Sequence, residues 1–286
     1  MMLLFLSLEV LLALLVGCNR EPAVPKEAEK VSMNLAFVLL AEPKYFKGEE
    51  VTRAFETFAA PGQQLLVKQE PGKDSAAAVL EFEFPPDGRA LLVTMPYSVP
   101  NEEAEEGAQF SVSSIGTGWT LPKHNAHIVV NLRDTSSSSA LESLSRFTSL
   151  LAAVVKASGA VGIYWGNAGA THDPEFFVSI AESPDIVPRI LLWTGVSIAN
   201  QTDGGVSILS LGMKQLDLPD LLLIAPKSSK DASLETFFEL LGYAVELGRP
   251  IPEGETVGRS DAERLPVSYV PSPVDADAKV WRVEMK

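Results

Sequence analysis

Cysteine and histidine are scarce in this chain. Of its 286 residues only Cys18 is a cysteine, and there are three histidines. The chain after Cys18 therefore offers no thiolate nucleophile, no thiolate metal ligand and no disulfide. The sequence also lacks the spacings GxGxxG and GxxxxGK[ST], which bind nucleotide phosphates, and the GxSxG turn of serine hydrolases. From these absences we predict no catalytic residue, no metal ion and no cofactor.

Basic side chains are in the minority as well. The chain has 23 Lys and Arg against 37 Asp and Glu, which gives a formal net charge of -14 at pH 7. A chain this acidic repels phosphate backbones, so we expect no nucleic-acid partner. Hydrophobic residues make up 46% of the chain, which is enough to build a sizeable core.

The single cysteine ends an apolar segment near the N-terminus. The run Leu11–Val16 is too short to span a bilayer, which needs about 20 residues, and has the length of a secretory signal core. Leu15-Val16-Gly17 then precedes Cys18 in the order of a lipobox, whose thiol receives a diacylglyceryl group before the leader is cleaved. We therefore predict a signal peptide over residues 1–17 and lipidation of Cys18.

The predicted leader is unusual in its charge. Residues 1–17 contain no Lys or Arg and include Glu9, whereas signal peptides normally open with basic residues. Either the true start lies upstream of Met1 or the signal is atypical; the alternative is a buried N-terminal helix with a core cysteine. Residues 18–32 are polar and contain two prolines, so we expect a lipidated tether. This places the protein in the cell envelope, on the periplasmic or cell-surface side of a membrane.

Hydrophobic periodicity after the tether predicts alternating strands and helices. Residues 33–40 form a continuous apolar run, typical of a strand that is buried on both faces. Residues 80–84 and 90–95 alternate around a turn, as in a hairpin, and the apolar run over residues 190–198 is consistent with a core strand. Apolar stripes at helical spacing follow Gly48, Ser139, Asp173 and Ser233. We predict an α+β (mixed α/β) fold in which mixed sheets pack with about four amphipathic helices.

A segment rich in glycine and serine divides this pattern. Residues 111–123 show no clear periodicity, and we expect them to join two lobes. The N-terminal α/β lobe would cover residues 33–110. The C-terminal α/β lobe would cover residues 123–286.

The three histidines, His124, His127 and His172, are the first candidates for a functional site. A zinc site needs three or four such donors around one metal ion, and the sequence has no HExxH spacing. Residues i and i+3 of a strand face opposite sides, which does not favour a metal pair at His124 and His127. We interpret all three as structural histidines, with ligand contact as the alternative.

Trp165 is a further candidate for ligand contact. Tryptophans are most often core aromatics. Trp165 nevertheless ends a short apolar run and stands beside Gly166-Asn167, where an indole can line a pocket.

Several phrases of the C-terminal part resemble a bacterial family catalogued as domain of unknown function 4261. They are His124-Asn-Ala-His127-Ile-Val-Val, Val161-Gly-Ile-Tyr-Trp-Gly166, Ser210-Leu-Gly-Met213 and Gly254-Glu-Thr-Val-Gly258. The resemblance extends from His124 to the C-terminus and is looser before it. Members of the family resemble one another in a Gly-Leu…Phe-Gly…Glu-Leu-Glu stretch where this chain has Gly205–Leu218, and Met213 and Asp217 depart from that pattern. The resemblance implies no established reaction and no catalytic residue, and it implies cytoplasmic relatives, from which a lipobox is a departure.

Two functions remain open at this point. The preferred one is a lipid-anchored envelope protein that serves as a non-catalytic protein- or ligand-binding domain. The alternative is an envelope hydrolase that uses the His124/His127/His172 region, with or without a metal ion. The hydrolase requires ring nitrogens that converge on one point, whereas a binding domain leaves the histidines packed and separately bonded.

Overall fold

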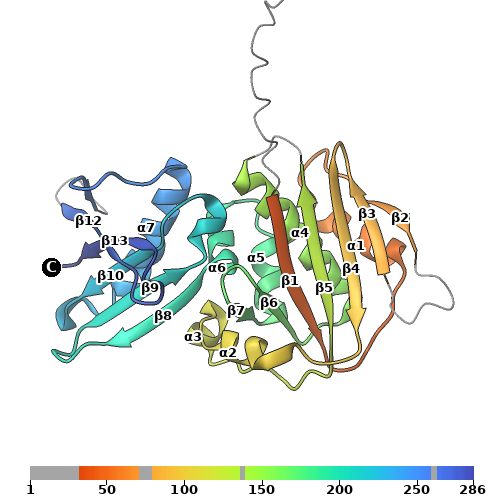
Figure 1. The fold of residues 1–286 in the computed structure, drawn as a ribbon, viewed down its shortest axis with the longest axis horizontal. Coiled ribbons are helices and arrows are strands. Elements are labelled where there is room, and N and C mark those ends of the chain that lie inside the picture. The colour runs from red at the N-terminus through yellow and green to blue at the C-terminus, as the bar shows by residue number, and fades with distance from the viewer. Residues whose placement is uncertain (1–31, 71–78, 136–138, 259–262) are drawn as a thin grey trace, which may run out of the picture. The chain divides into compact units, whose positions relative to one another are not determined.

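The fold combines helices with two multi-stranded sheets, which confirms the predicted α+β class (Figure 1). The computed structural model describes residues 32–70, 79–135, 139–258 and 263–286. The predicted signal peptide, Cys18 and nearly all of the tether lie outside the described residues, so their assignments stay predictions.

The larger sheet has seven strands in the order β2-β3-β4-β5-β1-β6-β7, and every neighbouring pair is antiparallel. The strands are β1 (Ser32–Leu40), β2 (Leu66–Gln69), β3 (Val79–Phe84), β4 (Gly88–Met95), β5 (Ala126–Asp134), β6 (Gly162–Trp165) and β7 (Ala170–His172). The expected hairpin is the β3–β4 pair. Residues 33–110 and 123–286, which we expected to form separate lobes, both contribute strands to this one sheet, because β5 lies between β4 and β1.

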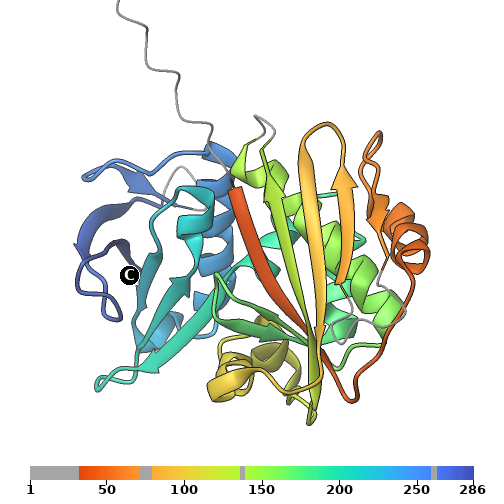
Figure 2. The same cartoon turned by 45° about the vertical axis from the view of Figure 1, so that its right-hand side comes forward.

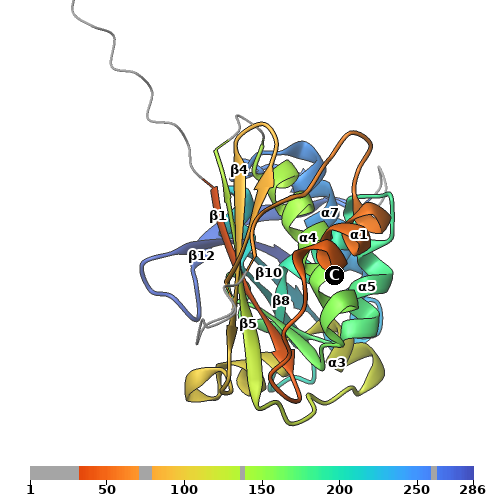
Figure 3. The ribbon, with the colours of Figure 1, turned by 90° about the vertical axis from the view of Figure 1, so that its right-hand side faces the viewer.

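Three helices cover one face of this sheet (Figure 3): α1 (Gly48–Phe58), α4 (Ala140–Ser158) and α5 (Pro174–Ala181). Helix α4 begins where the sequence predicts, because the Ser139 hydroxyl accepts a hydrogen bond from the Glu142 backbone N–H at 3.2 Å. It ends at Gly159, whose φ of 69° lies in the left-handed region that glycine adopts without strain. None of the helices in the described ranges is long and apolar enough to cross a membrane.

The smaller sheet has six strands in the order β11-β12-β13-β10-β9-β8 and packs against α7 (Ser233–Leu247), which lies behind its strands in Figure 2. The strands are β8 (Gly195–Asn200), β9 (Val206–Leu211), β10 (Leu221–Ala225), β11 (Thr256–Val257), β12 (Leu265–Pro271) and β13 (Lys279–Glu284). The β10–β13 pair is parallel, and the other pairs are antiparallel.

Three short α-helices and four 3₁₀ turns complete the elements of the described residues; the α-helices are α2 (Glu103–Ala108), α3 (Val112–Thr117) and α6 (Ile190–Trp193). Helix α3 occupies the segment that the sequence presents as irregular, since Ser111 caps it by accepting from the Ser113 N–H at 3.3 Å. Helix α6 replaces the first part of a strand that we expected over residues 190–198. The Trp193 indole N–H donates to Thr148 Oγ1 at 2.9 Å, and this buried contact stabilises the helical turn.

Candidate functional site

The register of the large sheet assigns its residues to two faces. Directly opposed residues of an antiparallel pair have their side chains on the same face. Val38 is opposite Ile128 and Ile163, and all three are fully buried on the face that the helices cover. Leu39 is opposite His127, so His127 projects from the other face.

His127 is held by a backbone carbonyl and two aromatic rings. Its Nδ1 lies 2.8 Å from the Tyr97 carbonyl oxygen; because a carbonyl only accepts, Nδ1 carries the proton. The rings of Phe37 and Tyr97 contact the imidazole edge-on, each at a centroid distance of 5.6 Å. Burial lowers the pKa of His127, the hydrogen bond to the Tyr97 carbonyl opposes this shift, and the nearby His124 adds to the lowering. This imidazole is a neutral, packed side chain at neutral pH.

His124 lies in the loop before β5. The rule that residues i and i+3 of a strand face opposite sides therefore does not apply to His124 and His127. Its Nε2 accepts the Val99 backbone N–H at 3.1 Å, which leaves the proton on Nδ1. Nδ1 faces Glu105 Oε1 at 3.4 Å, too long and poorly aimed for a hydrogen bond. Burial lowers the pKa of His124, and the Glu105 carboxylate opposes this shift. Both histidines thus pack against the segment that follows β4.

His172 lies on β7, opposite Ile163 and therefore on the helix-covered face. It is fully buried, its Nε2–H donates to the Leu192 carbonyl at 3.0 Å, and the Ser111 hydroxyl donates to Nδ1 at 2.9 Å. Burial lowers its pKa to about 4. Strands β5 and β7 are three inter-strand spacings apart, about 14 Å.

The three imidazoles therefore lie on two faces of the sheet and do not converge. Within the described ranges, no three His, Cys, Asp or Glu side chains are grouped closely enough to hold a metal ion. The hydrolase hypothesis lacks the convergent ring nitrogens that it requires.

Trp165 is a core residue in this structure. Its side chain is fully buried and packs edge-on against Phe147 at a centroid distance of 5.2 Å. Its indole N–H donates to Gln215 Oε1 at 2.9 Å. Gln215 in turn donates from Nε2 to the carbonyls of Trp193 and Gly212 at 2.7 and 2.8 Å. Trp165 thus links β6 to the 3₁₀ turn Met213–Leu216 instead of lining a surface pocket.

The face of the large sheet opposite α1, α4 and α5 is the feature that the sequence did not reveal. The apolar run of β1 predicted burial on both sides, but Met33 is 65% and Leu35 36% exposed. On β4, Leu91 is 40% exposed. Figure 3 shows these strands with helices on one side only along most of their length. We call this surface the open face; the prediction of two buried faces is wrong for it.

Two arginines lie at one end of the open face. Arg89 on β4 and Arg133 on β5 are directly opposite each other and exposed, next to Met33 of β1. Neither guanidinium makes a hydrogen bond or an ion pair with any residue that the structure describes. Glu83 on β3 lies directly opposite Arg89, but its ion pair is with Lys68 at 3.6 Å, and Lys68 also pairs with Glu81 at 3.1 Å.

Acidic side chains lie at the other end of the open face, on α2. Ala104 of this helix is buried against Leu39 and Tyr164, two residues of the open face. The carboxylates of Glu103 and Glu106 contribute to the raised pKa of Tyr164, after burial, and both side chains are exposed. The open face therefore has a basic end of bare strands and an acidic end that carries a helix.

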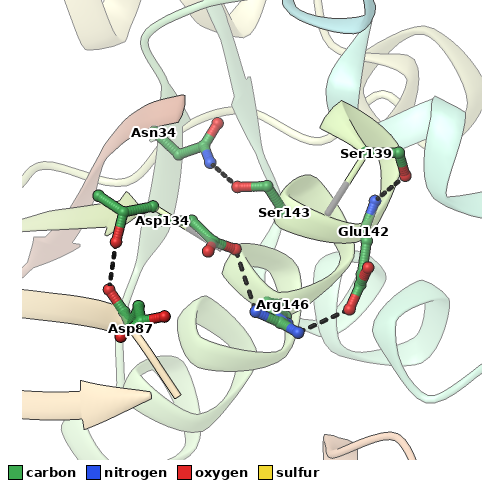
Figure 4. Close-up of polar contacts among 8 residues, drawn as sticks. Asn34, Asp87, Asp134, Ser139, Glu142, Ser143 and Arg146 are labelled. Atoms are coloured by element: carbon green, nitrogen blue, oxygen red, sulfur yellow. Dashed lines mark hydrogen bonds and ion pairs between the residues drawn. The ribbon is translucent and has the colours of Figure 1, made fainter. Parts of the chain in front are cut away.

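A polar cluster fixes the start of β1 to α4 (Figure 4). Asn34 donates from Nδ2 to Ser143 Oγ at 2.9 Å. Arg146 pairs with the buried Asp134 at 3.2 Å and with Glu142 at 2.6 Å, one helical turn away. Since the predicted tether enters the domain at β1, this cluster secures the strand to which the tether is joined.

A separate cleft lies between α7 and β11, with a volume of about 430 Å³. It is lined by Glu239, Leu240, Tyr243, Thr256, Val257 and Gly258. Glu239 and Tyr243 are one turn apart on α7, so a carboxylate and a phenol face the same recess.

Comparison with known families gives a match to part of the chain. Residues 209–284 match the model of the family described as Domain of unknown function (DUF4261). The matched segment contains Ser210–Met213 and Gly254–Gly258, two of the phrases that carry the resemblance, and it runs from β9 to β13. The search finds no curated protein and no solved structure that matches. The open face lies outside the matched segment.

Proposed function

We propose that this protein is a non-catalytic binding domain, anchored to a bacterial envelope membrane by lipid on Cys18, and that it binds a protein through the open face. The observation that carries the proposal is the exposure of apolar strand residues on that face. The anchor rests on the lipobox Leu15-Val16-Gly17-Cys18 and on the polar tether that follows it.

The composition of the open face fits a protein partner. Exposed Leu35 and Leu91 adjoin the half-buried Phe37, Val93 and Val129 in neighbouring positions of the register. A contiguous exposed apolar patch marks an interaction site more often than scattered apolar residues do. Arginine and aromatic side chains are enriched in protein interfaces, and this face has both.

The tether limits where the partner is found. Residues 18–32 span at most about 50 Å when fully extended. The open face, which begins at Met33, is then held within that distance of the bilayer. The partner is accordingly a protein exposed at the same membrane surface.

The test is crosslinked affinity capture from the envelope. We expect the unchanged protein to recover a stoichiometric partner, Leu91→Lys to lose it, and Cys18→Ala to lose or weaken it. The control is Val274→Lys, which places the same charge at an exposed apolar residue of the β12–β13 loop. A partner that is retained by Leu91→Lys as well as by the control would contradict binding through the open face.

A further inference from the structure

The two ends of the open face differ in shape as well as in charge. Over the end with Arg89 and Arg133 the strands are bare. At the other end α2 stands on the sheet, covering Leu39 and Tyr164 and presenting Glu103 and Glu106 to solvent. A bare basic half and a raised acidic half therefore adjoin on one surface.

The two arginines require an explanation in a chain with a net charge of -14. Like charges directly opposite each other in an antiparallel pair destabilise the pair. Glu83 lies opposite Arg89 across β3 but pairs with Lys68, and neither guanidinium makes an ion pair with a residue that the structure describes. This arrangement suits an anionic group that arrives from outside the protomer.

The acidic half of a second copy meets this requirement. A two-fold axis in the plane of the interface, midway between the two ends, places the bare half of each copy opposite α2 of its partner. Each Arg89/Arg133 pair then faces the partner's Glu103 and Glu106, twice in one dimer. A closed two-fold interface of this kind is self-complementary and leaves no open binding edge.

The bare part of the face supplies only a share of the interface. From Met33 to Phe37 is four residue steps along β1, about 13 Å, and β3 to β1 is three inter-strand spacings, about 14 Å. The bare strands thus have a projected area of about 190 Å², about a quarter of the roughly 800 Å² that each partner of a stable interface buries. The exposed sides of α2 in each copy supply the remainder in the dimer.

We infer that the protein bound at the open face is a second copy of this chain, in a two-fold dimer that pairs Arg89 and Arg133 with Glu103 and Glu106. The inference rests on the proposed function, since it names the partner of the same surface. It also accounts for the apolar β1 run. The second copy covers Leu35 and Phe37, so both faces of β1 are buried in the dimer.

The test exchanges the charges. Full-length protein in mild detergent is studied by sedimentation at about 1 to 100 µM, which covers the weak end of the affinities seen for protein interfaces. We expect a dimer for the unchanged chain. Arg89→Glu/Arg133→Glu and Glu103→Arg/Glu106→Arg should each raise the dimer dissociation constant by about 100-fold, because like charges then face each other. A one-to-one mixture of these two variants should restore a heterodimer, since every facing pair is again opposite in charge.

The matched control is Arg53→Glu/Lys214→Glu, which makes the same charge change at exposed residues outside the open face. We expect its dissociation constant to stay within about threefold of the unchanged chain, as for charges distant from an interface. Circular dichroism spectra establish that each variant is folded.

Three results would overturn the inference. A chain that stays monomeric at every concentration excludes the dimer. A dimer that survives both reversals uses another surface. Binding of the unchanged monomer to phosphatidylglycerol vesicles, lost in Arg89→Glu/Arg133→Glu, would identify the basic end as a membrane contact. Sedimentation and affinity capture together separate this inference from the proposed function. If the unchanged chain is monomeric but captures an envelope protein that Leu91→Lys does not capture, the proposed function stands and only the dimer fails. If the chain is monomeric and Leu91→Lys captures the same protein as the unchanged chain, both fail.

Discussion

Arg89 and Arg133 lie directly opposite each other across β4 and β5, exposed and side by side on a strongly acidic protein. Such a pair costs about 0.2–1 kcal/mol of protomer stability relative to neutral residues. Arg89 also has Glu83 opposite it on β3, whereas Arg133 is opposite only Arg89 and Met33. In the proposed dimer both guanidinium groups face Glu103 and Glu106 of the second copy.

This relationship predicts opposite effects on folding and on association. Arg133→Glu converts the like-charged pair into an opposite-charged one, so the free energy of unfolding should rise by about 1 kcal/mol. The same substitution should weaken the dimer. Urea unfolding at protein concentrations where the chain is monomeric measures the first effect. Arg53→Glu, at an exposed position of α1, should change the free energy of unfolding by less than about 0.5 kcal/mol. A destabilised Arg133→Glu protomer would show that the guanidinium supports the fold after all.

Much of the fold was predictable because local signals agree with the tertiary structure. The cap at Ser139 and the stop at Gly159 delimit α4 as expected, and alternation identified the β3–β4 hairpin. The segment Ile190–Trp193 was read wrongly as strand, because a short apolar run does not distinguish a buried helical turn from a strand. What decided it was the contact of Trp193 with Thr148, which no local pattern records.

The candidate site was predictable only in part. The sequence identified the histidines, but their packing and hydrogen bonds depend on partners far away in the chain, such as Val99 for His124 and Leu192 for His172. The open face was hidden by its own composition. A continuous apolar run predicts two buried faces, and in the protomer Met33 and Leu35 remain exposed. Disagreement of this kind between a local pattern and the observed structure is expected at functional surfaces.

His172 should make stability depend on pH. Its pKa is about 4 in the folded protein and near 6.5 when unfolded, so between these values the unfolded chain binds more protons. Its contribution is fully present above pH 6.5 and is lost as the pH falls towards 4, by about 3 kcal/mol in total. Burial lowers the pKa values of His124 and His127 too, so they add to the same slope.

His172→Gln isolates this effect. Glutamine keeps a donor for the Leu192 carbonyl and an acceptor for the Ser111 hydroxyl, but it does not titrate. Denaturant unfolding measures the free energy of unfolding of the unchanged chain and of His172→Gln between pH 6.5 and pH 4. The difference between the two free energies should become smaller as the pH falls. Parallel curves would show that His172 does not gain its proton on unfolding in this range.

Gln215 should be important for the packing of Trp165. Gln215→Ala removes the acceptor of a buried indole N–H and the two donors to the Trp193 and Gly212 carbonyls. A buried polar group left without a hydrogen bond costs about 1–3 kcal/mol, so we expect a loss in this range or above it. Lys214→Ala, at the exposed neighbouring residue, should cost less than about 0.5 kcal/mol. Thermal and urea unfolding provide the comparison, and equal effects at the two positions would contradict the role of this network.

The pair Arg146–Asp134 should contribute far more to stability than an exposed ion pair. Asp134 is almost fully buried, so removing the guanidinium in Arg146→Ala takes charge compensation away from a carboxylate that water reaches poorly. Loss of one partner of a buried pair costs about 3–5 kcal/mol, and the partial exposure of Arg146 places our expectation near 3 kcal/mol.

The matched control is Lys156→Ala on the same helix, whose contact with Glu182 at 3.8 Å is exposed on both sides. Lys156→Ala should lower the free energy of unfolding by less than about 1 kcal/mol, and by less still in high salt. Urea unfolding of both variants at low and high salt tests the contrast; losses of similar size would mean that Arg146 acts at the surface and does not secure the end of β5.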